Sequence, residues 1–479
     1  MAALASFPDT IVAMSTPVGQ GAVGIVRLSG PQALRVVESV FASKNGKPLS
    51  DAKTFTLKYG WVVRDKEAFE KSGRSPLACP AAVLDEVVVS LMRSPHSYTR
   101  EDVVEINSHG GPRVLSLILE ILLEKGARLA QPGEFTKRAF LNGRLDLAQA
   151  EAVLDIIQAK SDLALKNSLT HLAGELSRKM KVLRQEMLDV LAEIEARLDF
   201  SEEDIQAVPY DVYGSALEGI RRRLADLLEK SFCGRIVREG LKVAICGRPN
   251  AGKSSLLNAL LGAERAIVTA IAGTTRDTIE ECVNIRGLAV CLIDTAGVLE
   301  ARDEIERLAL ARTRNAIEDC DIVLFVLDGS GPLEDQDAAL LSFVKPSKKI
   351  IGVVNKSDLP RHADRARIRD LFRDRAVVEV SALTRDNIAA LEEEILRSVF
   401  HDPGILAADV LVSNVRHIDI LKAVVASLEH AQESLKNHLS LEFAAMDLRG
   451  ALNRLGELTG EVFHEELLET IFSKFCIGK

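Results

Sequence analysis

The 479-residue sequence predicts a multidomain fold in three parts: an N-terminal α+β domain, a discontinuous α-helical domain, and an α/β phosphate-loop domain inserted in the helical one. Residues 1–145 mix β-branched runs with helix signals, whereas residues 146–239 and 401–479 have helical spacing. Residues 240–400 alternate strands with helices, which is typical of a doubly wound sheet. Neither helical block is an obvious independent core, so we expect both to form one domain around the insertion.

Composition narrows the class of protein. An apolar content of 47% and a charged content of 27% are typical of a soluble globular chain. No apolar run is long enough to span a bilayer, and the N-terminus lacks a basic, apolar leader, so we expect a cytoplasmic protein without a membrane partner. The seven cysteines show no C-x-x-C spacing, which predicts neither a disulfide framework nor a zinc site. A net charge of −9 argues against coating nucleic acid by bulk charge, although a local basic patch stays possible.

The N-terminal domain should contain five strands and a helix. The strands are β-branched runs bounded by Gly, Pro or Ser, at 10–14, 24–28, 54–58, 86–91 and 102–106. The helix should run over 112–125, because it opens with proline and is followed by glycine. Residues 64–80 are polar with Gly and Pro, which predicts an exposed loop.

The helical blocks show apolar residues every three or four positions. From 147 to 198 the chain is almost free of Gly and Pro, and its apolar stripe over 165–198 predicts one long amphipathic helix. Further helices are expected over 212–230, 412–435, 442–458 and 464–474. Such a stripe favours packing in a bundle over a cofactor site.

The segment Gly247-Arg-Pro-Asn-Ala-Gly-Lys-Ser254 follows an apolar run at 241–246 and precedes a helical pattern. This G-x-x-x-x-G-K-S spacing allows backbone N–H groups at a helix N-terminus to cradle phosphates while Lys253 reaches the β and γ oxygens. Ser254 would hold Mg²⁺.

A second motif, Asp294-Thr-Ala-Gly297, ends the expected strand 289–293. Asp294 should lie near Mg²⁺ and the N–H of Gly297 near the γ-phosphate. Thr274 and Thr275 stand between the two motifs, where a switch threonine can complete the metal shell.

The nucleotide base is specified by Asn355-Lys-Ser-Asp358, after the strand 350–354. The carboxylate of Asp358 can accept both N1–H and N2–H of guanine but meets no donor on adenine, so it selects GTP. Ser381-Ala-Leu383 fits the loop whose backbone meets guanine O6. Motifs in this order, each at a strand end, predict GTP binding.

Hydrolysis needs a group that orients water, and the positions after Gly297 are Val298 and Leu299 in place of a glutamine. Acidic residues follow at Glu300, Asp303, Glu304 and Glu306. From composition alone they are equally a solvated helix start, since acids favour the first turn.

Seven strings carry a resemblance that covers essentially the whole chain: residues 24–30, 109–111, 132–142, 247–258, 271–277, 294–297 and the C-terminal Phe475-Cys-Ile-Gly-Lys479. They are similar to the MnmE (TrmE) family of tRNA modification GTPases. The resemblance implies a Ras-like G domain, a dimerising and folate-binding N-terminal domain, and a homodimer that works with the FAD-dependent protein MnmG as a heterotetramer. It implies that an aminomethyl or carboxymethylaminomethyl group is added to C5 of the wobble uridine, U34, of certain tRNAs.

The resemblance also assigns sites. GTP would be bound by Asn250, Ala251, Gly252, Lys253, Ser254, Ser255, Thr269, Ala270, Ile271, Ala272, Gly273, Thr274, Thr275, Asp294, Thr295, Ala296, Gly297, Asn355, Lys356, Ser357, Asp358, Ser381, Ala382 and Leu383. Mg²⁺ would be held by Ser254 and Thr275, and K⁺ by Asn250, Thr269, Ile271 and Thr274. The catalytic residues implied are Glu306, which orders the attacking water, with Lys253 and Thr275.

A one-carbon donor, 5,10-methylene- or 5-formyl-tetrahydrofolate, is implied at Arg27, Glu105, Arg144 and Lys479. Arginines suit its glutamate tail and a carboxylate suits the pterin edge, whereas the alternative is a surface ion pair. Cys476 could add to a uridine ring or to a one-carbon unit, but no His is adjacent in sequence, so we favour a buried or pocket-lining thiol.

Some positions depart from the family pattern. Arg100 replaces a usual glycine, Ser108 stands where many members have cysteine, and Leu299 replaces a common arginine.

The alternative function is a ribosome-assembly or regulatory GTPase switch, although the sequence shows neither a basic G-x-x-G clamp nor a basic tail. The amine donor, glycine or ammonium, and the set of tRNAs are left open by the sequence.

Overall fold

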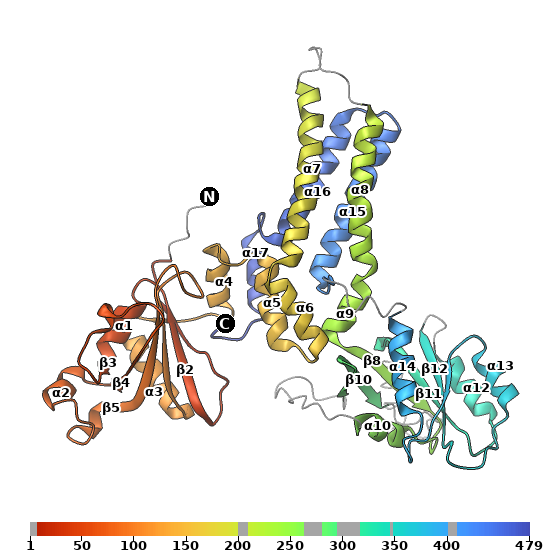
Figure 1. Ribbon diagram of the computed structural model, residues 1–479, viewed down its shortest axis with the longest axis horizontal. Coiled ribbons are helices and arrows are strands. Elements are labelled where there is room, and N and C mark those ends of the chain that lie inside the picture. Colours follow the sequence, from red (N-terminus) through yellow and green to blue (C-terminus); the bar gives the residue numbers. More distant parts are fainter. Residues whose placement is uncertain (1–6, 200–208, 263–279, 295–316, 345–347, 401–409) are drawn as a thin grey trace, which may run out of the picture. The chain divides into compact units, whose positions relative to one another are not determined.

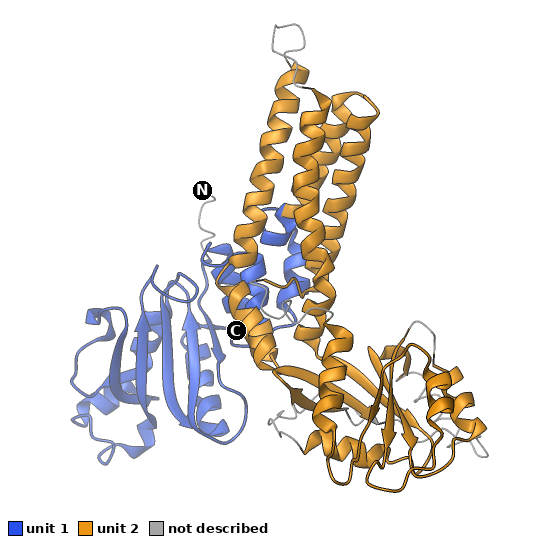
Figure 2. Cartoon of the chain, turned by 45° about the vertical axis from the view of Figure 1, so that its right-hand side comes forward, with its two compact units in different colours: residues 1–154, 456–479 blue, residues 155–455 orange. Residues whose placement is uncertain are grey.

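The structure is a computed structural model that describes residues 7–199, 209–262, 280–294, 317–344, 348–400 and 410–479. The chain forms two compact units (Figure 2): Met1–Leu154 with Gly456–Lys479, and Asp155–Leu455. The multidomain fold class expected from the sequence is confirmed, with an N-terminal α+β part, a helical part and an α/β part. The boundaries between predicted domains are not tested by this division and stay predictions.

The N-terminal part is built on a seven-stranded sheet of order β3-β4-β5-β6-β2-β1-β7, in which only the β1–β7 pair is parallel. The strands are β1 Ile11–Met14, β2 Gly21–Ser29, β3 Phe41–Ser43, β4 Thr56–Val63, β5 Val83–Met92, β6 Val103–Gly110 and β7 Arg128–Leu129. Helices α1 Ala33–Val40 and α3 Pro112–Glu124 pack on this sheet (Figure 1). Val37, Leu115 and Ile118 belong to the core between them and the strands. The five predicted strands and the predicted helix are confirmed, whereas β3 and β7 are too short to show a sequence pattern.

The predicted loop over 64–80 is wrong in part, because it contains the helix α2 Lys66–Lys71. Asp65 caps this helix by accepting the N–H of Ala68. Phe69 is fully buried, with its ring centroid 5.6 Å from that of Trp61. One buried aromatic in a polar segment is enough to fix a short helix against the sheet. The rest of this unit includes 3₁₀ turns at Leu49–Asp51 and Pro80–Ala82, α4 Glu134–Leu141 and α17 Glu465–Phe472.

The expected long helix over 165–198 is wrong, because the chain breaks at Gly174. Gly174 has φ +84°, a left-handed conformation that ends a helix at little cost only for glycine. The result is two helices, α6 Asp162–Leu172 and α7 Glu175–Asp199, preceded by α5 Leu147–Gln158. The other predicted helices are confirmed as α8 Tyr210–Glu229, α15 Val415–Lys436, α16 Leu441–Thr459 and α17, with α9 Ser231–Glu239 in addition.

Helices α8 and α15 lie side by side although the whole α/β part separates them in sequence (Figure 1). The side chain of Gln432 donates to the carbonyl of Gly214 and to Glu218, each at 3.2 Å. Arg221 forms an ion pair with Glu429. These contacts join the two helical blocks of the sequence. No described helix is long and apolar enough to cross a membrane.

The α/β part has a six-stranded sheet of order β13-β12-β11-β8-β10-β9, parallel except for β9. Its strands are β8 Leu241–Gly247, β9 Glu280–Ile285, β10 Leu288–Asp294, β11 Ile322–Asp328, β12 Lys349–Asn355 and β13 Val377–Glu379. Side chains alternate along β8, so Val243 and Ile245 enter one core with α10 Lys253–Leu261 and α14 Ile388–Val399. Ala244 and Cys246 enter the opposite core with α12 Asp335–Ser342 and α13 Arg365–Phe372.

Cys282 and Cys291 form a disulfide between β9 and β10, so the expectation of no disulfide is wrong. The antiparallel register places these two residues directly opposite each other. Their spacing of nine residues matches no disulfide motif, and only the strand pairing reveals the contact.

Candidate functional site

The phosphate loop joins β8 to α10, as the motif predicts. Gly252 is the N-cap of α10 and has φ +91°. A Cβ at this position would lie 2.1 Å from Nδ2 of Asn355, so both the conformation and the space require glycine. Ser254 is exposed on the first turn of α10, and Asn250 is exposed in the loop at φ +64°. The backbone N–H groups at the N-terminus of α10 therefore lie directly beside the loop, where they can bind phosphate.

Lys253 is held against this loop. It is 8% exposed, and its Nζ donates to the carbonyl oxygens of Gly247 at 3.0 Å and Arg248 at 2.8 Å. These bonds keep the ammonium beside the N–H groups that would bind phosphate, where its charge has the most effect. Its contact with the β and γ oxygens of GTP stays a prediction.

Arg248 fastens the loop to α12. Its Nε donates to Asp337 at 2.7 Å, and its guanidinium also pairs with Glu334. Asp337 is 1% exposed and closes a capping box with Glu334 at the start of α12. Burial lowers the pKa of Arg248, but the hydrogen bonds to both carboxylates outweigh it and raise that pKa. The sequence analysis missed this anchor, whose only signal was the acidic start of α12.

Asn355 connects three of the predicted motifs. It ends β12 and is 2% exposed. Its Nδ2 donates to the carbonyl oxygens of Ala251 at 3.1 Å and Gly252 at 3.4 Å. Its Oδ1 accepts the N–H groups of Lys356 at 2.8 Å and Ala382 at 3.0 Å. One amide side chain therefore sets the phosphate loop and both base loops relative to one another.

The base loops have their own support. The hydroxyl of Ser381, which is fully buried, donates to Oδ1 of Asp358 at 2.5 Å. Lys356 donates to Asp328 at 2.5 Å. Burial raises the pKa of Asp328, but hydrogen bonds from Lys356 and Ser330 outweigh this and lower it. Asp328 ends β11, and an acidic residue at a strand end was the one signal that could have identified it.

Other predicted nucleotide and metal residues lie outside the described residues: Thr269, Ala270, Ile271, Ala272, Gly273, Thr274, Thr275, Thr295, Ala296, Gly297 and Glu306. Asp294 is the last residue of β10, and its backbone is in register with Ile245 of β8. Both strands are parallel, so Asp294 lies at the sheet edge that carries the phosphate loop. Ser357 and Leu383 are exposed in the two base loops, and Ser255 is exposed on α10.

The predicted folate residues gather at a second place, within the N-terminal unit. Arg27 on β2 donates through Nε to Glu105 on β6 at 2.8 Å and through its terminal nitrogen to the Gly478 carbonyl at 3.3 Å. Its guanidinium carbon lies 6.0 Å from the Tyr98 ring centroid and 5.8 Å from that of Phe135. The β2–β6 register pairs Arg27 directly with Glu105.

Arg144 and the C-terminus contact the same two residues, Tyr98 and Phe135. The guanidinium of Arg144 lies 4.7 Å from the Tyr98 ring centroid, and the carbonyl of Lys479 accepts the N–H of Phe135 at 3.2 Å. Burial raises the pKa of Tyr98, and its hydrogen bond with Thr136 offsets only part of this. The sequence analysis missed Tyr98 and Phe135, which have no signal of their own in the motifs. Cys476 is exposed, so of the two expected settings the buried one is wrong, whereas a pocket-lining thiol stays a prediction.

The structure describes the surroundings of two residues that depart from the family pattern, Arg100 and Ser108. Arg100 has φ +60°, the left-handed conformation that glycine adopts freely, which explains a usual glycine at this position. Its guanidinium donates to the carbonyl of Asn142 at 2.9 Å. Ser108 is buried and its hydroxyl donates to the carbonyl of Gly24 at 3.3 Å.

A strand, phosphate loop and helix tied through Asn355 to an Asn-Lys-Ser-Asp loop define a P-loop protein that binds guanine nucleotides. Two family models match, described as "MnmE helical domain" over residues 147–476 and "GTP-binding protein TrmE N-terminus" over residues 10–144. The chain belongs to the MnmE family of tRNA modification GTPases. The resemblance noted in the sequence is thereby confirmed.

Full-length relatives named tRNA modification GTPase MnmE include those of Alkaliphilus metalliredigens, 43% identical over 98% of this chain and 99% of the relative, and Geobacillus kaustophilus, 44% identical over 98% and 99%. The relative from Bacillus subtilis is 42% identical over 98% and 100%. Among solved structures, Aquifex aeolicus Era bound to GDP·AlF4⁻ is 28% identical over 39% of this chain and 65% of that one, with a TM-score of 0.28.

Proposed function

We propose that the chain hydrolyses GTP and that this turnover serves a covalent modification of tRNA at the wobble uridine. The observation that carries the proposal is the position of Asn355, which bonds the phosphate loop, Lys356 and Ala382 at one sheet edge. A nucleotide bound there would contact the loop with its phosphates and Asp358 with its base.

In this mechanism Lys253 exchanges its bonds to loop carbonyls for the β and γ oxygens of GTP. The hydroxyl of Ser254 is exposed on the first turn of α10 and suits Mg²⁺, with Thr275 as the second protein ligand. Water ordered by Glu306 attacks the γ-phosphorus, the bond to the bridging oxygen breaks, and the water proton leaves as GDP and phosphate form. No oxidation or reduction is involved in this step.

K⁺ is proposed as a further activator. Asn250 is exposed in the phosphate loop, and its side-chain oxygen is a donor of the kind that K⁺ accepts as a ligand. A monovalent cation held there, with Thr269, Ile271 and Thr274, would stabilise charge that develops in the transition state. GTP turnover should be faster in K⁺ than in Na⁺, and Asn250→Ala should remove the difference. Equal rates of the unmodified chain in the two salts would sink this part of the proposal.

A folate one-carbon donor, 5,10-methylene- or 5-formyl-tetrahydrofolate, is proposed at Arg27, Glu105, Arg144 and Lys479. The side chains of Arg27 and Glu105 are only 18% and 19% exposed, which is less than expected of a plain surface ion pair. Two guanidinium groups around the Tyr98 ring offer both charge for a glutamate tail and an aromatic face for a pterin. This combination supports a ligand site.

The proposed partners are a second copy of the chain and the FAD-dependent protein MnmG. The test is mass spectrometry of wobble nucleosides in tRNA from cells that lack the gene, complemented by wild type or by Lys253→Ala. Loss of 5-aminomethyl-type uridines, restored by wild type only, supports the proposal. The mass of the added group also tells glycine from ammonium as amine donor. Unchanged nucleosides would instead support a ribosome-assembly or regulatory GTPase.

A further inference from the structure

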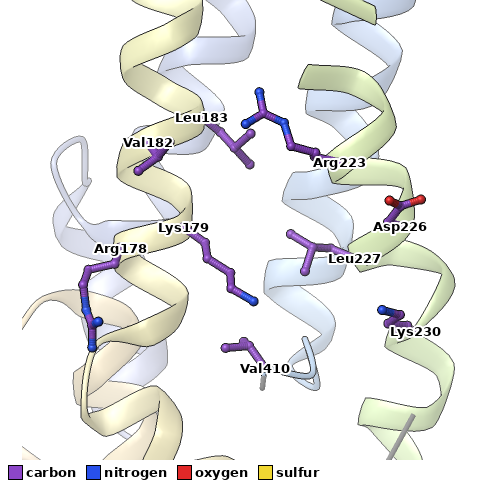
Figure 3. A pocket seen from close by; sticks show the side chains of 9 residues that line it. All are labelled: Arg178, Lys179, Val182, Leu183, Arg223, Asp226, Leu227, Lys230 and Val410. Carbon is purple, nitrogen blue, oxygen red and sulfur yellow. The ribbon is translucent and has the colours of Figure 1, made fainter. Parts of the chain in front are cut away.

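A groove of about 590 Å³ lies between α7 and α8 in the helical part of the chain (Figure 3). Lys179 projects from α7 into the space between the helices, and Arg223 projects into it from α8. Lys230 lies on the same wall as Arg223, close to the end of α8. The groove is thus bordered by cations from both helices.

The base of the groove is apolar. Leu183 and Val410 are 4% and 3% exposed, and Leu227 is half-buried. Val182 stands at the edge with 56% of its surface exposed and adds apolar surface there. A hollow with an apolar base and a cationic border suits a ligand that carries both negative charge and a less polar body.

The charges of the groove are unbalanced. Four lining residues are cationic, since Arg178 joins the three above, and Asp226 is the one lining carboxylate. With Glu175 and Glu186 counted, because they pair with the two arginines, the net charge is +1 (four minus three). Arg178 is paired with Glu175 and Arg223 with Glu186, at 2.6 and 2.9 Å.

Lys179 and Lys230 differ from these arginines. Their ammonium groups make no hydrogen bond or ion pair within the described part of the chain. Excess charge of one sign on low-dielectric walls focuses the field and attracts the opposite charge.

We propose that this groove binds the phosphate backbone of the RNA substrate, an inference that rests on the proposed function because that function makes tRNA the substrate. A chain with net charge −9 repels RNA over most of its surface, so it needs a local cationic surface to hold one. Lys179 and Lys230 contact phosphates, and the apolar base receives a ribose or an unstacked nucleobase. The volume admits about one or two nucleotides.

The test is binding of fluorescently labelled substrate tRNA to the full chain, measured by anisotropy across a series of KCl concentrations. The variant is Lys179→Glu with Lys230→Glu. The matched control is Lys166→Glu with Lys181→Glu, which makes the same charge change at exposed lysines on α6 and α7 that do not line the groove. GTP turnover without RNA should be the same in all three proteins, which verifies that each is folded.

The groove variant should bind tRNA at least about tenfold more weakly than the control. The slope of log affinity against log salt should fall by about 0.7 to 0.9 for each phosphate contact removed. Equal affinity and slope for variant and control would overturn the inference, as would an unmodified chain that shows no salt-dependent binding.

A groove variant that binds tRNA normally but fails to restore wobble nucleosides in cells would assign the groove to an acidic protein partner and overturn RNA binding. Failure of the proposed function is a separate result. In that case deletion of the gene leaves wobble nucleosides unchanged, whatever the groove variant does in the binding assay.

Discussion

Replacement of Asp358 by Asn tests whether the base loops select guanine as proposed. The Asp358 carboxylate is oriented by the buried Ser381 hydroxyl at 2.5 Å and can accept two guanine N–H groups. Asparagine keeps one acceptor but presents a donor where guanine also donates. It instead matches xanthine, which has an oxygen in place of the 2-amino group.

The expected loss of GTP affinity follows from the two hydrogen bonds between Asp358 and guanine. Hydrogen bonds to a charged group contribute about 1.5 to 3 kcal/mol each. Asp358 is exposed, so the lower figure applies to each bond, and the total is about 3 kcal/mol. At about 1.4 kcal/mol per factor of ten, GTP should bind about 100-fold more weakly.

The assay is a fluorescence titration with labelled GTP and XTP. The control, Asp370→Asn, makes the same charge change at an exposed carboxylate on α13. GTP affinity of Asp358→Asn within about threefold of the control, against the 100-fold loss expected, would refute this reasoning. So would the absence of any gain in XTP binding.

Three further predictions concern other parts of the molecule. Lys253→Ala should lower GTP turnover by at least about 100-fold, seen as phosphate release, because positive charge beside the loop is lost while the fold is kept; turnover like wild type contradicts its assigned role. Arg27→Ala should weaken folate binding by at least about tenfold in a calorimetric titration, and unchanged affinity counts against that site. Arg138→Met should lower the free energy of unfolding by about 3 to 5 kcal/mol in urea, because the fully buried guanidinium pairs with Asp9, Glu101 and Glu134. Burial raises the pKa values of Asp9 and Glu134, but hydrogen bonds from arginines outweigh it and lower both, so this stabilisation is present above their ordinary values of 3.8 and 4.5 and is lost as pH falls through the lower folded values. The variant should lose less stability than wild type as pH falls below these ordinary values, and an identical pH profile would contradict this.

Local patterns predicted the secondary structure best where a segment carries both a clear residue pattern and a boundary signal. Five strands and the helix over 112–125 follow from β-branched runs and a proline start. The long helix over 165–198 failed because its apolar stripe continues across Gly174, while backbone conformation at one residue ends it. The helix α2 was missed because six residues in a polar segment carry little periodicity, and Phe69 gains its burial from the sheet.

In the nucleotide site, too, the sequence identified some residues and missed others. Lys253 and Asp358 were found because their motifs fix a strand end, a loop and a helix start within a few residues. Arg248 and Asp328 were missed, because their partners Asp337 and Lys356 lie tens of residues away and meet them only across the sheet edge.

The sequence by itself determined the class of nucleotide, the order of the domains and the family, because these depend on short motifs whose chemistry is local. Only the tertiary structure decided which distant side chains meet. Arg27, Arg144 and the C-terminal Lys479 come from three separate parts of the chain, and they meet at Tyr98 and Phe135. Lys179 and Lys230 become one groove only when α7 packs beside α8. Spacing along a chain cannot report such contacts, since they are set by how buried faces pack.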